Sequence, residues 1–159
     1  MVDRVSIDRT CAAPGCRVPR DRWLTFRLLL LLPAFGAALR LGGFRRAYGA
    51  AEWLSTRSVR RSAHGSRTPQ QITDLVVHVN RHVLPYQSKC LLESLALWYL
   101  LRRRGYDAAL YLGARTLLGP FEAHAWVELD GEVLNDAPNI RDVYEPFELT
   151  GISARPESP

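Results

Sequence analysis

The chain has 159 residues, of which 47% are hydrophobic and 23% charged, so it can bury a core and is not intrinsically disordered. Its net charge of +5 is uneven, because residues 1–67 carry +9 and residues 68–159 carry −4. A basic half favours an acidic partner, but no nucleic-acid-binding motif accompanies it. The odd number of cysteines, Cys11, Cys16 and Cys90, excludes a complete disulfide framework and indicates a reducing, cytoplasmic environment.

The N-terminal part is predicted to be a flexible tail over residues 1–19 and a basic helical region over residues 20–67. Its apolar run holds only 12 residues between Arg27 and Arg40, or about 18 Å of helix against about 30 Å for a bilayer core. Membrane contact is therefore expected to be peripheral at most. Breaks in the helices are predicted near Pro33 and at Gly42-Gly43.

Residues 68–150 are predicted to form the core of the protein, followed by a tail over residues 151–159. Apolar residues recur at helical spacing from 72 to 83, and a second helix, from about Ser88 to Gly105, is apolar on almost every side. An apolar strand over 106–115, a hairpin over 121–136 and a short strand or loop over 140–149 follow. A buried helix ahead of an antiparallel sheet, with further helices before it, predicts the α+β class.

Cys90 is a candidate nucleophile because it lies in the first turn of the predicted buried helix. Free amide groups and the positive end of the helix dipole stabilise a thiolate there, and Lys89 acts in the same direction. The competing interpretation is a structural cysteine, since free cysteines are commonly buried.

His124 is the candidate base. In the strand "FEAHAWVEL" the alternation of side chains places Ala125 and Val127 on the core face, and His124 on the other face beside an exposed-side tryptophan, Trp126. Trp126 is expected to shield the site, to contact substrate or to serve packing alone. The pair His78 and His82 lacks the glutamate of a zinc-peptidase motif, so neither a metal nor a cofactor is predicted.

The orienting group for His124 depends on the hairpin register. A two-residue turn at Asp130-Gly131 would place Asp136 opposite Ala125, on the core face, and leave Asn135 diagonal to His124. A three-residue loop ending at Gly131 would place Asp136 directly opposite His124, with Cβ atoms about 5 Å apart. Both loops suit the residues, so either Asp136 or Asn135 can be the orienter.

Two stretches carry a family resemblance, "KCLLESLALWYLLRRRGYDAALYLGAR" and "FEAHAWVELDGEVLND". Together they resemble the lasso-peptide leader peptidases, small transglutaminase-like, papain-like cysteine proteases of bacteria. The resemblance covers residues 86–147 and rests on a cysteine that opens the helix, the "AHAWVE.DG" motif and a following acidic residue. It implies the catalytic residues Cys90, His124 and Asp136, and so favours Asp136 and the three-residue loop.

The resemblance also implies a function and partners. Such proteases remove the leader from a ribosomally made precursor peptide, before a separate ATP-dependent cyclase closes a macrolactam. The chain looks like the split form of the system, in which a small recognition-element protein binds the leader, and it is expected to depend on that partner. In the implied mechanism the backbone amide of Cys90, helped by Gln87, holds the oxyanion.

Two other functions use the same fold. A docking module of the same biosynthetic complex would bind leader, recognition protein and cyclase without catalysis. A transglutaminase or amidase would share the three catalytic groups and differ in the acceptor of the acyl group.

Overall fold

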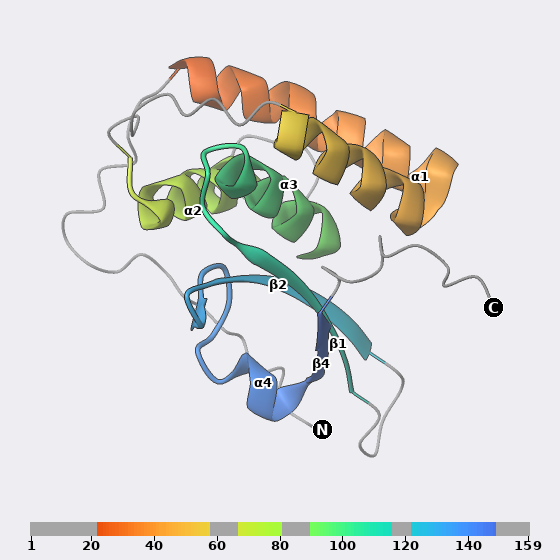
Figure 1. Ribbon diagram of the computed structural model, residues 1–159, viewed down its shortest axis with the longest axis vertical. Coiled ribbons are helices and arrows are strands. Elements are labelled where there is room, and N and C mark those ends of the chain that lie inside the picture. The colour runs from red at the N-terminus through yellow and green to blue at the C-terminus, as the bar shows by residue number, and fades with distance from the viewer. Residues whose placement is uncertain (1–21, 58–66, 81–89, 116–121, 149–159) are drawn as a thin grey trace.

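The computed structural model describes residues 22–57, 67–80, 90–115 and 122–148. Figure 1 shows helix α1 on one side, α2 and α3 beneath it, then a sheet, with the short helix α4 beyond the sheet. This layered arrangement is α+β, as predicted. The predicted tails, with Cys11 and Cys16, lie outside the described residues, and the division at residues 67 and 68 stays a prediction.

Helix α1 (Arg22–Arg57) is a hairpin of two helical arms that turn at Gly43, whose φ of 70° and ψ of 170° are not helical. Figure 1 shows the second arm (yellow) turning back beside the first (orange). The break predicted at Gly42-Gly43 is confirmed. The break predicted near Pro33 is wrong: Pro33 lies inside the helix on its exposed face, where solvent can reach the carbonyl group that loses its partner.

Helix α2 (Pro69–His78) starts with a capping box, in which Thr68 and Gln71 each accept a hydrogen bond from the other's backbone amide. Pro69 occupies the first helical position, where its missing amide hydrogen costs nothing. The predicted apolar face is buried from Ile72 to Val79, and residues 81–89, which follow, are outside the described part.

Helix α3 (Cys90–Arg102) is the central helix, and it packs against α1, α2 and strand β2. Nine of its 13 residues are buried, which confirms the prediction from its apolar composition. Trp98 is fully buried; its ring stacks on Tyr48 of α1 at 4.9 Å, and its Nε1 donates a hydrogen bond to the carbonyl of Ala108 at 3.0 Å. These contacts fix α3 between the hairpin and the sheet.

The sheet has four antiparallel strands in the order β3-β2-β1-β4. Leu110 and Val127 are completely buried in the core that α3 shares with the sheet. The segment predicted as a short strand or loop contains a turn of helix, α4, before the last strand. The strands are β1 (Ala109–Arg115), β2 (Glu122–Leu129), β3 (Glu132–Val133) and β4 (Glu145–Glu148), and α4 is Ile140–Val143.

The hairpin between β2 and β3 has the two-residue turn, because Leu129 pairs with Glu132. Asp130 and Gly131 have φ values of 52° and 82°, the positive pair that a type I′ turn requires. The three-residue loop favoured from the family resemblance is therefore wrong. An Asp-Gly pair suits the tight turn, whose twist matches that of the strands.

Replacing Gly43 with Ala should destabilise the protein, since its φ and ψ lie in a region that is essentially restricted to glycine. We expect the free energy of unfolding to fall by about 1–3 kcal/mol in urea denaturation. Gly49→Ala is the matched control, because Gly49 is helical and an added Cβ meets nothing within 4 Å. That change should stabilise the protein by up to about 1 kcal/mol. Equal effects at the two glycines would contradict the assignment of the turn to Gly43.

Candidate active site

Cys90 is the first residue of α3, and its half-buried side chain is hydrogen-bonded to the side chain of His124. Burial raises the pKa of the Cys90 thiol, but the hydrogen bond and charge of His124, with backbone hydrogen bonds from Ala125 and Leu91, lower it by more. The net pKa is below the usual 9.0. The environment therefore favours the thiolate, which is the nucleophilic form.

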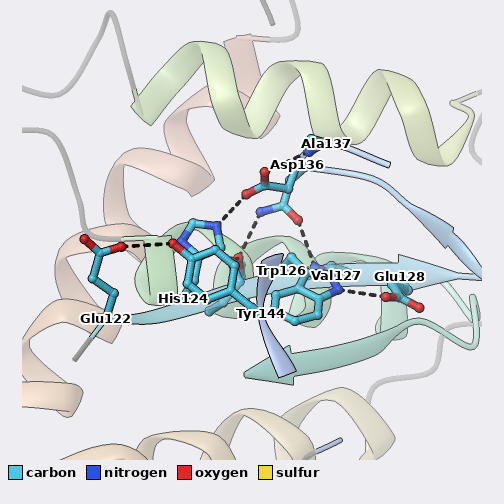
Figure 2. Close-up of polar contacts among 11 residues, drawn as sticks. Glu122, His124, Trp126, Val127, Glu128, Asp136, Ala137 and Tyr144 are labelled. Carbon is cyan, nitrogen blue, oxygen red and sulfur yellow. Dashed lines mark hydrogen bonds and ion pairs between the residues drawn. The ribbon is translucent and has the colours of Figure 1, made fainter. Parts of the chain in front are cut away.

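His124 projects from β2, and its Nε2 lies 2.5 Å from Oδ2 of Asp136 (Figure 2). The hydrogen bond to Asp136, then the hydrogen bond and charge of Cys90, raise the pKa of His124 to about 10, although burial lowers it. Because Nε2 faces the carboxylate, Nδ1 is the ring nitrogen that remains for the thiol. The three side chains form a continuous line from Cys90 through His124 to Asp136.

Asp136 reaches His124 because the chain leaves the sheet soon after Val133. The amide of Leu134 still bonds to the carbonyl of Val127 at 2.9 Å, but no further ladder pair forms between β2 and β3. Continued pairing would have put Asp136 on the core face. The departure frees it from the alternation of the strand, and this explains why the expected contact forms although the expected register is wrong.

Asn135 makes that departure possible, since its side chain takes the place of a strand partner. Its Oδ1 accepts a hydrogen bond from the amide of Val127 at 2.8 Å, and its Nδ2 donates to Oγ of Ser94 at 2.9 Å. The hydroxyl of Ser94 in turn donates to the carbonyl of Ala125 at 2.9 Å. We call these two residues, Ser94 and Asn135, the clamp, because they join α3, β2 and the segment that carries Asp136.

The clamp decides between the two candidate orienters and adds a residue that the sequence analysis missed. Asn135 does not orient His124; both ends of its side-chain amide are bonded to Val127 and Ser94. Ser94 is completely buried and lies four residues after Cys90, so both are on one face of α3. A small polar residue one turn after the cysteine, at the start of the long apolar run of the helix, was the signal that could have identified it.

Aromatic rings surround His124 on the face of the sheet away from α3. The ring of Tyr144 stacks on the imidazole at 5.2 Å, and that of Trp126 lies at 6.5 Å (Figure 2). Gly113, which pairs with His124 in the sheet, leaves room for both rings; a Cβ there would come within 2.7 Å of each residue. The rings limit the orientations that the imidazole can adopt.

Trp126 is completely buried, so the expectation of an exposed-side tryptophan is wrong. Its Nε1 donates to Oε1 of Glu128 at 2.7 Å, and Arg141 from α4 makes two hydrogen bonds to the same carboxylate, at 2.6 and 2.7 Å. The guanidinium also lies 4.8 Å from the ring of Tyr111, which stacks on Trp126. This burial favours packing and shielding for Trp126 over direct contact with substrate.

Glu128 is buried, and its charge is compensated locally. Burial raises the pKa of its carboxyl group, but the hydrogen bonds from Arg141 and Trp126, with the charge of Arg141, together lower it by more. The net pKa therefore lies below the ordinary value. The Arg141–Glu128 pair thereby holds α4 against the outer face of the sheet, beside the wall of aromatic rings.

Two residues expected near the site, Gln87 and Lys89, lie outside the described residues. Within the described ranges, no group of three His, Cys, Asp or Glu side chains is placed to hold a metal ion. The chemistry supported by the described groups is that of a thiol activated by an imidazole.

Comparison with known proteins places this site in a family. A model of the transglutaminase-like superfamily matches residues 31–148, which include Cys90, His124 and Asp136. The chain belongs to the transglutaminase-like superfamily. Over 61 residues it is 49% identical to the microcin J25-processing protein McjB of Escherichia coli, a stretch that is 38% of this chain and 28% of McjB. The match thus spans less than a third of that relative, and no solved structure matches the chain.

The clamp is testable by replacing Asn135 with Ala. The amide of Val127 would lose its partner, so we expect the free energy of unfolding to fall by about 1–3 kcal/mol in urea denaturation. Asn139→Ala is the matched control, since Asn139 is exposed and makes no side-chain capping bond to α4. The clamp would be refuted by similar stability losses in the two variants.

The charge on His124 is testable by Asp136→Asn, which removes the first cause of its raised pKa. In an NMR titration the wild-type imidazole should titrate near pH 10, and the variant imidazole nearer to 6.5. The protonated ring stabilises the folded state fully below about pH 6.5, and this contribution is lost as the pH rises through about 10. An unchanged His124 titration in the variant would show that Asp136 does not set the pKa.

Proposed function

We propose that this protein is a cysteine peptidase that removes the leader from a ribosomally synthesised lasso-peptide precursor. The observation that carries the proposal is the line from Cys90 through His124 to Asp136. The similarity to the microcin J25-processing protein supports the choice of a peptide as substrate. Membership of the transglutaminase-like superfamily is consistent with a thiol nucleophile acting on an amide.

The proposed reaction has two steps. The Cys90 thiolate attacks the scissile carbonyl carbon, and the His124 imidazolium gives its proton to the leaving amine, which releases the core peptide. A water molecule, deprotonated by His124, then hydrolyses the thioester and frees the leader. Asp136 remains ionised and holds the imidazole in place, while the backbone amide of Cys90, with Gln87, would hold the oxyanion.

The proposed partners follow from this substrate. The precursor would be presented by a separate leader-recognition protein, and the released core would pass to the ATP-dependent macrolactam cyclase. The reaction would take place in the cytoplasm, where Cys90 stays reduced. Activity should depend on a reduced thiol. As the pH rises, activity should increase through the lowered pKa of Cys90, where the thiolate forms, and decrease near pH 10, where His124 loses its proton.

A second candidate function is acyl transfer to an amine, or deamidation, because the superfamily is named for transglutaminases. In that case the Cys90 thiolate would attack a side-chain amide of the substrate and release ammonia. An amine would then attack the thioester to form a new amide, or water would hydrolyse it to a carboxylate. A docking module without catalysis is the third reading. It would not require the lowered thiol pKa or the ion pair with His124.

Replacing Cys90 with Ala should abolish leader removal, with a fall in rate of at least about 10³-fold, while thermal unfolding stays cooperative. Asp136→Asn should reduce kcat by about 10²–10⁴-fold. Asp142→Asn is its matched control, since Asp142 is exposed on α4 and should leave the rate unchanged.

Mass spectrometry of the precursor, incubated with this protein and the recognition protein, reads out the reaction. Free leader and free core, with one added water between them, support the peptidase. A cross-linked or deamidated precursor supports acyl transfer, and an unchanged precursor that nevertheless binds supports the docking module. Cleavage that persists in the Cys90→Ala protein would overturn the assignment of the nucleophile.

A further inference from the structure

The first arm of α1 has an outer face without a partner among the described residues. Its core-facing side is buried, from Leu24 to Phe35, whereas the opposite side is exposed and carries apolar residues at intervals of three or four. Phe26 and Leu30 are each 58% exposed, and Leu41 is 87% exposed. The exposed apolar positions are Phe26, Leu30, Pro33, Ala34, Ala37 and Leu41.

The second arm extends this surface and adds positive charge. Trp53 and Leu54 of the second arm are 54% and 44% exposed. Exposed arginines, Arg45 and Arg46, follow the turn at Gly43, and Arg40 precedes it. Across residues 22–57 there are six arginines and a single acidic residue. We call this combined surface the outer face of α1.

The outer face is too apolar to be an ordinary solvated helix surface. An 18-residue stretch within Leu24–Ser55 has a mean hydropathy of 1.6, in the range of membrane-crossing helices, yet only 22% of that stretch is buried. A helix that is apolar on every side normally has partners on every side. A transmembrane orientation does not suit α1, because its inner side packs on α3 and the chain turns back at Gly43.

We propose that the outer face of α1 lies flat on an anionic lipid bilayer. The stripe from Phe26 to Leu41 would extend about 22 Å along the interface. Leucine, phenylalanine and tryptophan would enter the acyl boundary, and the arginines around the turn would pair with anionic headgroups. A flat helical face with surrounding arginines matches this surface, whereas a peptide is normally held in a groove. The one carboxylate among residues 24–55, that of Glu52, is only partly exposed.

The position of this face also suits the site. Figure 1 shows α1 on the side of α3 away from the sheet, and Asp136 and the aromatic rings belong to the sheet side. A bilayer on the outer face would therefore leave Cys90 and His124 accessible to a soluble peptide. Membrane binding goes beyond the proposed function, and neither requires the other.

The test is co-sedimentation of the full chain with vesicles, either pure phosphatidylcholine or a mixture with phosphatidylglycerol. We expect binding to the anionic vesicles, at least about tenfold weaker on pure phosphatidylcholine or when salt is raised to about 0.5 M. The combined change Phe26→Ser, Leu30→Ser and Leu41→Ser, and separately Arg45→Glu with Arg46→Glu, should each reduce binding by at least about tenfold. Val143→Ser is the control, since Val143 is 38% exposed on α4 and should leave binding unchanged.

Other results would overturn the proposal. The absence of vesicle binding would overturn it, and so would equal binding to both lipid compositions. A wild-type dimer that the serine variants convert to monomer would assign the face to a second copy of the chain instead. Capture of a protein partner that the serine variants abolish, without vesicle binding, would also overturn it. Cleavage of a soluble precursor by the serine variants, measured in parallel, separates this outcome from failure of the proposed peptidase.

Discussion

The hydrogen bonds of the clamp are the constraint on which the site depends. Asn135 bonds to a strand amide through one end of its side chain and to a helix hydroxyl through the other, and Ser94 extends the line to Ala125. These hydrogen bonds join α3, β2 and the segment after β3, which carry Cys90, His124 and Asp136 respectively. They therefore fix the distances between the thiol, the imidazole and the carboxylate. A buried network in which every member has a partner is rigid, whereas a partly satisfied one would be costly.

Residues on the outer side of the sheet also restrain the imidazole of His124. Glu128 is a buried charge that is stabilised because Arg141 and Trp126 surround it, and the same bonds fix the indole beside His124. Trp126 and Tyr144 can pack beside His124 only because residue 113 is glycine, since any side chain at that position would collide with both of them. The imidazole is thus restrained by a carboxylate at its edge and by aromatic rings against its faces.

Much of the fold could be predicted because its signals are local. The continuous apolar run of α3, the capping residues of α2 and the glycines at the turn of α1 each act within a few positions of the chain. The superfamily could also be inferred from motifs near Cys90 and His124. The proximity of His124 and Asp136 was expected correctly, and their catalytic role remains a proposal.

What could not be predicted arises from contacts between distant residues. Period-two alternation assumes a continuing ladder, and it cannot show that the Asn135 side chain will replace a backbone partner and release Asp136. The burial of Trp126 depends on Arg141, which is 15 positions away and in another element. Pro33 remains inside α1 because its exposed side offers a solvated carbonyl, a property of tertiary orientation that the proline itself does not indicate.

Cys90 and Asp136 come from segments 46 positions apart, and the imidazole between them comes from a third. In an unfolded chain the thiol is an ordinary cysteine, mostly protonated at neutral pH and slow to react. The hydrogen bonds that lower the pKa of this thiol form only after α3 and β2 have docked, and Asp136 reaches His124 only once the segment after β3 is in place. The lowered pKa of the thiol is therefore a property of the folded protein and not of the cysteine alone.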